Sequence, residues 1–309
     1  MIVSIKNNWS DIKETHNEYV KSRIDSFTSQ PLRKNNLSMH TVDFLLENGD
    51  LIVSDKLDDL IRSARHFDML IAFNSTTPNV IARLKRDLKK IFNYKAFTDK
   101  KKSYDAYDLC AKSKSRTCPY CNQAFAFTVQ DLNGSFRPTL DHFFSKDLYP
   151  HLALSLSNLI PSCSTCNSSL KNIKDFYLQP HLHPLFDDEN IQFILTGKTN
   201  REKINILSDI NEKDVEIDLL PTTCKKTNLS IETFLIKKRY QYTIFEAVNF
   251  AKNIITLDEY SRNSQLKLTN EINISSALLF DTRNYSNSIL GKLFHDIYNQ
   301  LKTHYKKVT

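Results

Sequence analysis

The sequence predicts an α+β fold that is mostly α-helical, with a small strand-containing domain embedded between helical flanks. Three observations predict it. Only four glycines occur in 309 residues, which leaves little material for a turn-dense all-β fold. Apolar residues recur at helical spacing on both sides of a central segment. Within that segment the hydrophobic period shortens to that of a strand, and two Cys-x-x-Cys pairs, Cys118–Cys121 and Cys163–Cys166, enclose the shortened pattern.

The overall composition is that of a globular protein. Hydrophobic residues make up 40% of the chain and charged residues 25%, and the length suffices for roughly two ordinary domains. The N-terminus lacks a signal-peptide pattern, and no apolar run is long enough to span a bilayer. We therefore expect a cytoplasmic protein without membrane contact.

Three regions are expected along the chain. Residues 1–103 form a helical region, residues 104–187 the central domain, and residues 188–309 a second helical region. The first boundary is placed near Lys100–Ser103, where lysines cluster. The triplet Gly197-Lys198-Thr199 looks like the end of a P-loop, but Gln192 stands where that loop requires glycine, so no nucleotide site is predicted.

Helices are expected on both sides of the central domain. Ser10 is a plausible N-cap for a helix over residues 10–27, and Ser54 can cap the next helix. Thr77-Pro78 begins a third helix, since proline suits the first helical position. In the C-terminal region, apolar spacing predicts helices within 230–255 and 286–305.

The third helix is amphipathic and has a basic face. The cations of this face are Arg83, Lys85, Arg86, Lys89 and Lys90. Residues 81–116 as a whole hold twelve Lys or Arg against four Asp. Such an excess favours the approach of a polyanion, mainly through counterion release from phosphates. The alternative is a solvated helix face.

The central segment reads as a hairpin followed by a helix. Alternating apolar residues over 124–129 predict a strand. Asp131–Gly134 supplies a turn, in which the glycine takes a positive backbone φ, and residues 135–143 return as the second strand. That strand closes on Asp141-His142. A helix follows from Ser164, so that the two cysteine pairs lie together at the base of the hairpin.

Six cysteines occur in the chain, and four of them belong to the two pairs. Because cytosolic thiols are held reduced, such pairs are more typical of metal ligands than of disulfides. Each pair can present two thiolates to a tetrahedral Zn²⁺. The predicted ligands of one structural zinc are Cys118, Cys121, Cys163 and Cys166. Cys110 and Cys224 are assigned no role.

The polar residues between and beside the cysteines suit metal-assisted hydrolysis of a phosphodiester. A neutral histidine can take a proton from an attacking water near neutral pH, which is the role predicted for His142. Mg²⁺ or Mn²⁺ needs one or two oxygen ligands from the protein, which Asp141 and the amide of Asn167 can supply. The Asn158 side chain can bind loop backbone and hold His142 in place. Because neighbouring strand residues point to opposite faces, the strand has to end or bend at His142.

Three cations are candidate phosphate contacts because they lie near these residues in the sequence. They are Arg137, Lys146 and Lys171. Each of them is equally compatible with an ordinary surface charge. Position along the chain alone supports the assignment.

The motif resembles the HNH endonucleases with the ββα-metal fold, in their four-cysteine form. The resemblance covers about seventy residues. It implies that Asp141 and Asn167 bind the catalytic metal, that His142 is the general base and that Asn158 supports the loop. This sequence has Asn167 where the founding pattern has a second histidine, and several branches of the family share that substitution.

A narrower resemblance is to the HNH proteins of bacterial anti-phage systems of the Septu and retron-linked kind. These often read His-Phe-x-Pro-Lys-Ser-x-Tyr-Pro after the catalytic Asp. Here Phe143, Lys146, Tyr149 and Pro150 match, whereas Ser145 and Asp147 replace the proline and the serine. The resemblance implies a DNA-cleaving effector that works beside a separate ATPase.

Two alternatives stay open. A zinc-stabilised nucleic-acid-binding module without catalysis explains the cysteines and the basic segment, yet it has no need for Asp141-His142 or for both asparagines. A nuclease that acts on RNA uses the same residues and differs only in its substrate.

Overall fold

The fold is described from a computed structural model that covers residues 1–309. Placement is described for all residues except 31–36, 100–102, 199–209, 264–270 and 306–309. Most of the predicted boundary near Lys100–Ser103, and Thr199 of the P-loop-like triplet, therefore lie outside the described residues.

The chain divides into two compact units, each of which gathers separate stretches of sequence. The first, called the site unit below, comprises Ile5–Lys114 and Ala126–Phe186. The second unit comprises Met1–Ser4, Ser115–Phe125 and Asp187–Thr309. The three sequence domains proposed above remain predictions.

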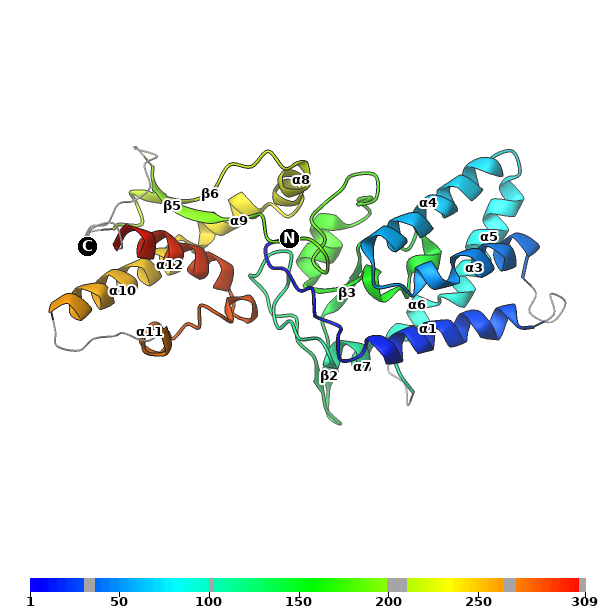
Figure 1. The fold of residues 1–309 in the computed structure, drawn as a ribbon, viewed down its shortest axis with the longest axis horizontal. Helices are drawn as coiled ribbons and strands as arrows, with labels where there is room; N and C mark the ends of the chain where they lie inside the picture. The colour runs from blue at the N-terminus through cyan, green and yellow to red at the C-terminus, as the bar shows by residue number, and fades with distance from the viewer. Residues whose placement is uncertain (31–36, 100–102, 199–209, 264–270, 306–309) are drawn as a thin grey trace. The chain divides into compact units, whose positions relative to one another are not determined.

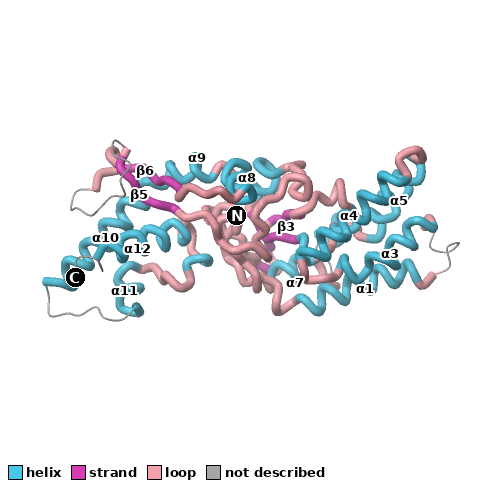
Figure 2. Tube along the Cα trace, turned by 45° about the horizontal axis from the view of Figure 1, so that its top comes forward, coloured by secondary structure: helices cyan, strands magenta, loops and turns pink. Residues whose placement is uncertain are grey.

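The predicted α+β class is confirmed at the level of secondary structure. Helices hold about half of the chain, and the strands of the described residues form three separate two-stranded sheets. Figure 2 shows the strands as short segments among helices and loops. No helix of the described part is long and apolar enough to cross a membrane.

The N-terminal half of the site unit is helical (Figure 1). Its helices are α1 (Lys13–Thr28), α3 (Met39–Ile52), α4 (Leu57–Phe73), α5 (Pro78–Ile91), α6 (Tyr94–Thr98) and α7 (Ala106–Ala111). Helix α3 packs against α1, α4 and α5. Phe44, Leu45 and Phe67 are almost completely buried between them, so this packing forms an apolar core that supports the segments that follow.

The helix starts agree with the sequence in one case and differ in two. Helix α5 begins at Pro78, as predicted. Helix α1 begins after Ile12, which offers no capping side chain, so Ser10 is not its N-cap. Helix α4 begins after Lys56, and the Ser54 hydroxyl instead accepts a hydrogen bond from the Lys56 amide at 3.2 Å. Helix α3, capped by Ser38, has no counterpart in the prediction.

The strands pair differently from the predicted hairpin. Strands β1 (Val129–Gln130) and β2 (Ser135–Phe136) form only a two-residue ladder. Strand β3 (Thr139–His142) pairs antiparallel with β4 (Leu159–Ser162). Pro138 separates β2 from β3 and lacks the N–H that a continuous ladder needs, which accounts for the break.

The segment around β4 contains three short helices. They are the 3₁₀ turns η1 (Pro150–Leu152) and η2 (Leu156–Asn158) and the π-helix η3 (Thr165–Lys171). Leu159 and Ile160 of β4 are fully buried, and the Trp9 indole donates to the Leu159 carbonyl at 3.0 Å. The chain order is therefore strand, antiparallel strand, helix, with β3 packed on η3.

The second unit has one sheet with helices. Strands β5 (Phe193–Gly197) and β6 (Val215–Leu219) pair antiparallel. Its helices are α8 (Lys225–Thr233), α9 (Ile236–Tyr240), η4 (Gln241–Thr243), α10 (Ile244–Asn263), α11 (Glu271–Leu278), η5 (Tyr285–Asn287) and α12 (Gly291–Tyr305). Helix α12 packs on α10 and on β5.

Both C-terminal helix predictions need correction. The segment 230–255 is broken at Leu235, whose φ of 52° lies in the left-handed region and ends α8 before α9 begins. In 286–305, the regular helix begins only at Gly291 because Leu290 has a φ of 57°. Neither position carries glycine, so hydrophobic periodicity alone concealed both breaks.

Candidate active site

The four cysteines of the two pairs come together. Their sulfur atoms all lie within 4.8 Å of one another. Cys118, Cys121 and Cys166 are fully buried, and Cys163 is half-buried. A tetrahedral zinc with bonds of about 2.3 Å places its sulfurs about 3.8 Å apart, so the cluster fits this ion. None of these four cysteines is in a disulfide, which agrees with the prediction of a metal site.

Each pair is folded into a tight turn with an amide aimed at a sulfur. The Gln123 amide lies 3.5 Å from the Cys121 sulfur, and the Cys166 amide lies 3.4 Å from the Cys163 sulfur. In the first pair, the Asn122 amide donates to the Cys118 carbonyl at 2.7 Å, with a φ of 51° at Asn122. Backbone N–H groups aimed at sulfur in this way also accompany metal-binding cysteines.

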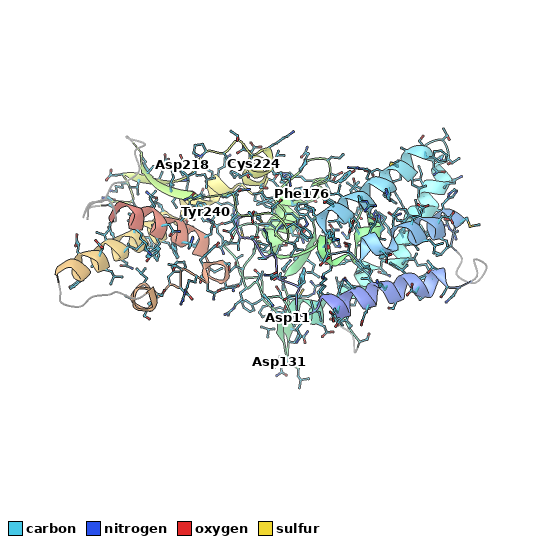
Figure 3. The ribbon with its side chains drawn as sticks, in the orientation of Figure 1. Asp11, Asp131, Phe176, Asp218, Cys224 and Tyr240 are labelled. Atoms are coloured by element: carbon cyan, nitrogen blue, oxygen red, sulfur yellow. The ribbon has the colours of Figure 1, made fainter. Side chains whose placement is uncertain are left out.

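Asn122 fixes the first turn to the rest of the second unit. Its side-chain nitrogen donates to the Thr117 hydroxyl at 2.9 Å and to the Ser288 carbonyl at 3.0 Å. The Asn122 oxygen accepts from the Lys292 amide. Tyr240, labelled in Figure 3, donates its hydroxyl to the Cys121 carbonyl at 2.7 Å. The left-handed position that follows Cys121 explains the asparagine, although the sequence analysis gave it no role.

A cleft of about 500 Å³ in the site unit brings together the other predicted residues except Asn158, which is buried and does not line it. Its walls include Asp141, His142 and Asn167, together with the candidate cations Arg137, Lys146 and Lys171. Strand β3 ends at His142, so the two adjacent residues both border the cleft. Asn167 lies near the start of η3, half-buried, with its amide bonded to the Cys163 carbonyl at 3.0 Å.

His142 is buried and held through one ring nitrogen. Nε2 lies 3.0 Å from the Ala153 carbonyl, and because a carbonyl only accepts, Nε2 carries the proton. Nδ1 is then the nitrogen with a lone pair. Burial is the main cause that lowers the pKa of His142 to about 3, and the ammonium groups of Lys146 and Lys171 lower it further. The imidazole is therefore neutral near pH 7 and carries its lone pair on Nδ1.

Asp141 is paired with Lys171 in the interior. The Lys171 ammonium lies 2.9 Å from an oxygen of the Asp141 carboxylate, and both side chains are 2% exposed. The same ammonium donates to the His142 carbonyl at 2.6 Å and faces the ring of Phe176, with 4.9 Å between Nζ and the ring centroid. Lys171 thus fixes the carboxylate and the end of β3 at once. The sequence suggested a phosphate contact here and gave no sign of this pairing.

Asn158 holds the backbone that follows His142 in place. Its side-chain oxygen accepts from the Phe144 amide at 2.7 Å, and its nitrogen donates to the carbonyls of Phe144 and Leu152, both at 3.0 Å. The side chain is fully buried. Its three bonds tie the chain after β3 to the turn before Ala153, the residue that binds the His142 ring.

The remaining candidate cations differ in their surroundings. Arg137 donates to the Pro138 carbonyl at 2.9 Å, and its guanidinium lies over the ring of Tyr107. Lys146 is 42% exposed and lies 3.8 Å from Asp147. Lys146 therefore remains accessible from the cleft, whereas Arg137 is partly engaged by its own unit.

The sequence analysis missed one aromatic residue of the cleft. Tyr94 of α6 borders the cleft and packs edge-to-face on the His142 ring, with the ring centroids 4.3 Å apart. Its hydroxyl donates to the Leu140 carbonyl at 3.2 Å. Burial raises the pKa of this hydroxyl, so that Tyr94 stays neutral. No local pattern links a tyrosine forty-eight positions away to the histidine; only the fold brings them together.

Comparison with known proteins gives one partial similarity. The chain is 32% identical over 72 residues to the Septu protein PtuB of Bacillus thuringiensis, which is 22% of this chain and 28% of that protein. The chain thus matches less than a third of that relative's length. No family model matches the chain. No solved structure matches it either.

Proposed function

We propose that the protein is a metal-dependent endonuclease of the HNH type, which hydrolyses phosphodiester bonds of DNA with His142 as general base. The observation that carries the proposal is the cleft in which a neutral His142 borders Asp141 and Asn167. A proton acceptor beside oxygen ligands is the minimum that metal-assisted hydrolysis of a phosphodiester requires.

The chain's own residues can orient the base without further help. The Ala153 carbonyl binds Nε2–H of His142 and leaves Nδ1 as the proton acceptor. Asn158 holds the two backbone segments on either side of that contact. Tyr94 packs on the imidazole and restricts its rotation. A water bound in the cleft at Nδ1 can therefore lose its proton as it attacks the phosphorus.

Asp141 and Asn167 would hold the catalytic metal. Carboxylate and amide oxygens are the donors that Mg²⁺ and Mn²⁺ prefer, and both residues border the cleft. When bound, the ion stabilises negative charge on the phosphate and on the leaving oxygen. Lys171 keeps the Asp141 carboxylate oriented. The four-cysteine cluster would hold a structural zinc, which positions Asn167 through its direct neighbour Cys166.

The biological setting we propose is anti-phage defence beside a separate ATPase. Two observations support it: the 72-residue similarity to the Septu protein PtuB, and the His142–Pro150 segment, which resembles the HNH proteins of Septu and retron-linked systems. The sequence shows no P-loop, which is consistent with nucleotide hydrolysis by a separate partner.

The direct test is nicking of supercoiled plasmid by the purified protein with Mg²⁺ or Mn²⁺. We expect nicking to disappear with a chelator and in His142→Ala, with the variant still folded and its zinc content unchanged. His66→Ala is the matched control, because His66 lies on α4 and does not border the cleft. Cleavage of RNA but not of plasmid would replace DNA as the substrate. An inactive, zinc-loaded protein, alone and with a co-expressed ATPase, would contradict the proposal.

A further inference from the structure

A second, smaller groove adjoins the cleft. It has a volume of about 180 Å³ and shares three of its lining residues with the cleft, namely Tyr94, Lys146 and Asp147. The two depressions therefore form one continuous surface of the site unit. We call the smaller one the lysine groove, because Lys89, Lys95 and Lys146 border it.

The three lysines of the groove come from different parts of the site unit. Lys89 lies in the last turn of α5, Lys95 in α6 and Lys146 in the loop after β3. Lys89 and Lys95 are exposed, and the Lys146 side chain is 42% exposed. A solvated helix face places its cations along one helix. Cations that converge from three segments on one groove instead create a local positive potential.

Other cations of α5 are turned to different partners. Arg83 pairs with the buried Asp87 at 3.1 Å, and the Lys90 ammonium lies over the ring of Phe27. The basic face predicted from the sequence is therefore not a single surface. Lys89 is the member of that face that borders the groove, and this distinction makes a matched control possible.

The floor of the groove is apolar and extends toward His142, the proposed general base. Phe92 and Ala153 are 1% and 4% exposed, and the Ala153 carbonyl binds the His142 ring. A chain of phosphates whose reacting member lies at His142 would continue over this floor. Its next phosphates would then lie between Lys89 and Lys95.

One carboxylate opposes the lysines. Asp147 borders both depressions and lies 3.8 Å from the ammonium groups of Lys89 and of Lys146. Its side chain is 67% exposed, and exposed pairs of this kind contribute only about 0–1 kcal/mol. A phosphate can therefore replace Asp147 as the partner of either lysine at little cost.

We infer that the lysine groove binds the DNA backbone that flanks the cleaved bond, with Lys89 and Lys95 on phosphates beyond the one that reacts. The inference rests on the proposed nuclease function for its choice of substrate. It adds the direction in which the strand leaves the cleft and two residues that take part in binding and not in chemistry. It also assigns Asp147 as a group that weakens DNA binding.

The test measures binding apart from cleavage. Fluorescence anisotropy of a labelled duplex in Ca²⁺ buffer without Mg²⁺ gives Kd as a function of salt. The double variant Lys89→Gln/Lys95→Gln should weaken binding about tenfold and lower the slope of log Kd against log salt by about 0.9 for each lost phosphate contact. Asp147→Asn should tighten binding several-fold. The control Lys85→Gln/Arg86→Gln removes the same charge from α5 outside the groove and should change Kd less than about twofold.

The outcomes separate this inference from the proposed function. Equal weakening in the groove and control variants would show a diffuse charge effect and overturn the groove. A wild-type salt slope in the groove variant would overturn it as well, even if plasmid is nicked. Groove-dependent binding by a protein that never nicks would keep the groove and reject the nuclease.

Discussion

At the residue scale, the buried pair of Asp141 and Lys171 carries the most consequence. The Lys171 ammonium, 2.9 Å from the Asp141 carboxylate, holds that carboxylate in one orientation while it also binds the His142 carbonyl. The metal-binding role proposed for Asp141 requires such a fixed orientation. Both charges are buried, so the free-energy cost of removing each charge from water is offset largely by its attraction to the other. The pair therefore couples the fold of this unit to the geometry of the cleft.

We expect Lys171→Met to destabilise the site unit by about 3–5 kcal/mol, because it removes the ammonium that pairs with a buried carboxylate. Adding Asp141→Asn should recover much of the loss, since neutral groups then replace both charges. Urea unfolding followed by circular dichroism gives both values. The control is Lys174→Met, a lysine three positions on. Strictly additive losses in the double variant would show that the two side chains are not coupled.

At the element scale, the start of α12 is closely packed. A Cβ added at Gly291 would lie 1.9 Å from the Tyr285 carbonyl oxygen, and that atom is backbone that cannot move aside by rotation. Leu290 just before it has a positive φ and bonds its amide to the Asn122 carbonyl at 2.8 Å. The first cysteine turn and the start of α12 are thus fixed by the same contacts.

We therefore predict that Gly291→Ala lowers the melting temperature strongly, at a cost of about 3 kcal/mol or more. Gly134→Ala is the matched control, because a Cβ there meets nothing within 4 Å. The positive φ that the sequence suggested for Gly134 is absent, so its replacement brings no strain. Differential scanning fluorimetry compares the two. Similar melting temperatures in both variants would count against the close packing at Gly291.

The cysteine cluster gives a second prediction at this scale. Cys118→Ser and Cys166→Ser should each lower the zinc content, from about one ion per chain, together with stability, because ligand loss and unfolding are linked. Cys224→Ser should change neither, since Cys224 lies outside the cluster. Metal analysis after gel filtration, beside thermal unfolding, measures both quantities. Full zinc occupancy in both ligand variants would reject a four-cysteine site.

At the scale of the whole molecule, buried neutral histidines set the response to acid. His16 and His151 are fully buried, and desolvation lowers the pKa of His16 to about 4 and of His151 to about 3. Their unfolded pKa is about 6.5, so the unfolded chain binds more protons below that pH. Stability is complete above pH 6.5 and falls as the pH drops toward 4.

We predict that the free energy of unfolding falls by about 1 kcal/mol per pH unit for each of these histidines between pH 6.5 and 4. His151 lies among the rings of Phe44, Phe67 and Tyr149, so His151→Phe keeps an aromatic side chain there. In this variant, the free energy of unfolding should depend less steeply on pH, and the slope should fall by the contribution of one histidine. Urea unfolding midpoints of the wild type and the variant across this pH range provide the comparison. An equal pH dependence in both would show that His151 does not contribute to acid destabilisation.

The sequence predicted features that depend on neighbouring residues better than it predicted contacts between distant residues. The two Cys-x-x-Cys pairs and the start of α5 at Pro78 both follow from signals within a few residues. The predicted strand partner of β3 was wrong. Its actual partner, β4, comes after a long loop, and no turn signal in the sequence indicates that pairing. Tyr94 and the Lys171 pairing likewise depend on tertiary packing.

The π-helix η3 affects which deletions and substitutions this segment of the chain can tolerate. Its seven residues, Thr165–Lys171, turn more widely than an α-helix and hold one residue more in the turn. Deletion of the Leu170 codon would leave the reading frame intact and allow ordinary α-helical winding. The larger rotation per residue of an α-helix, about 100°, would then offset the lost residue and leave Lys171 on nearly the same side of the axis, toward Asp141. Point substitutions at the exposed Ser168 or Ser169 leave the winding intact as well, so this short segment should accept both a changed side chain and the loss of one residue.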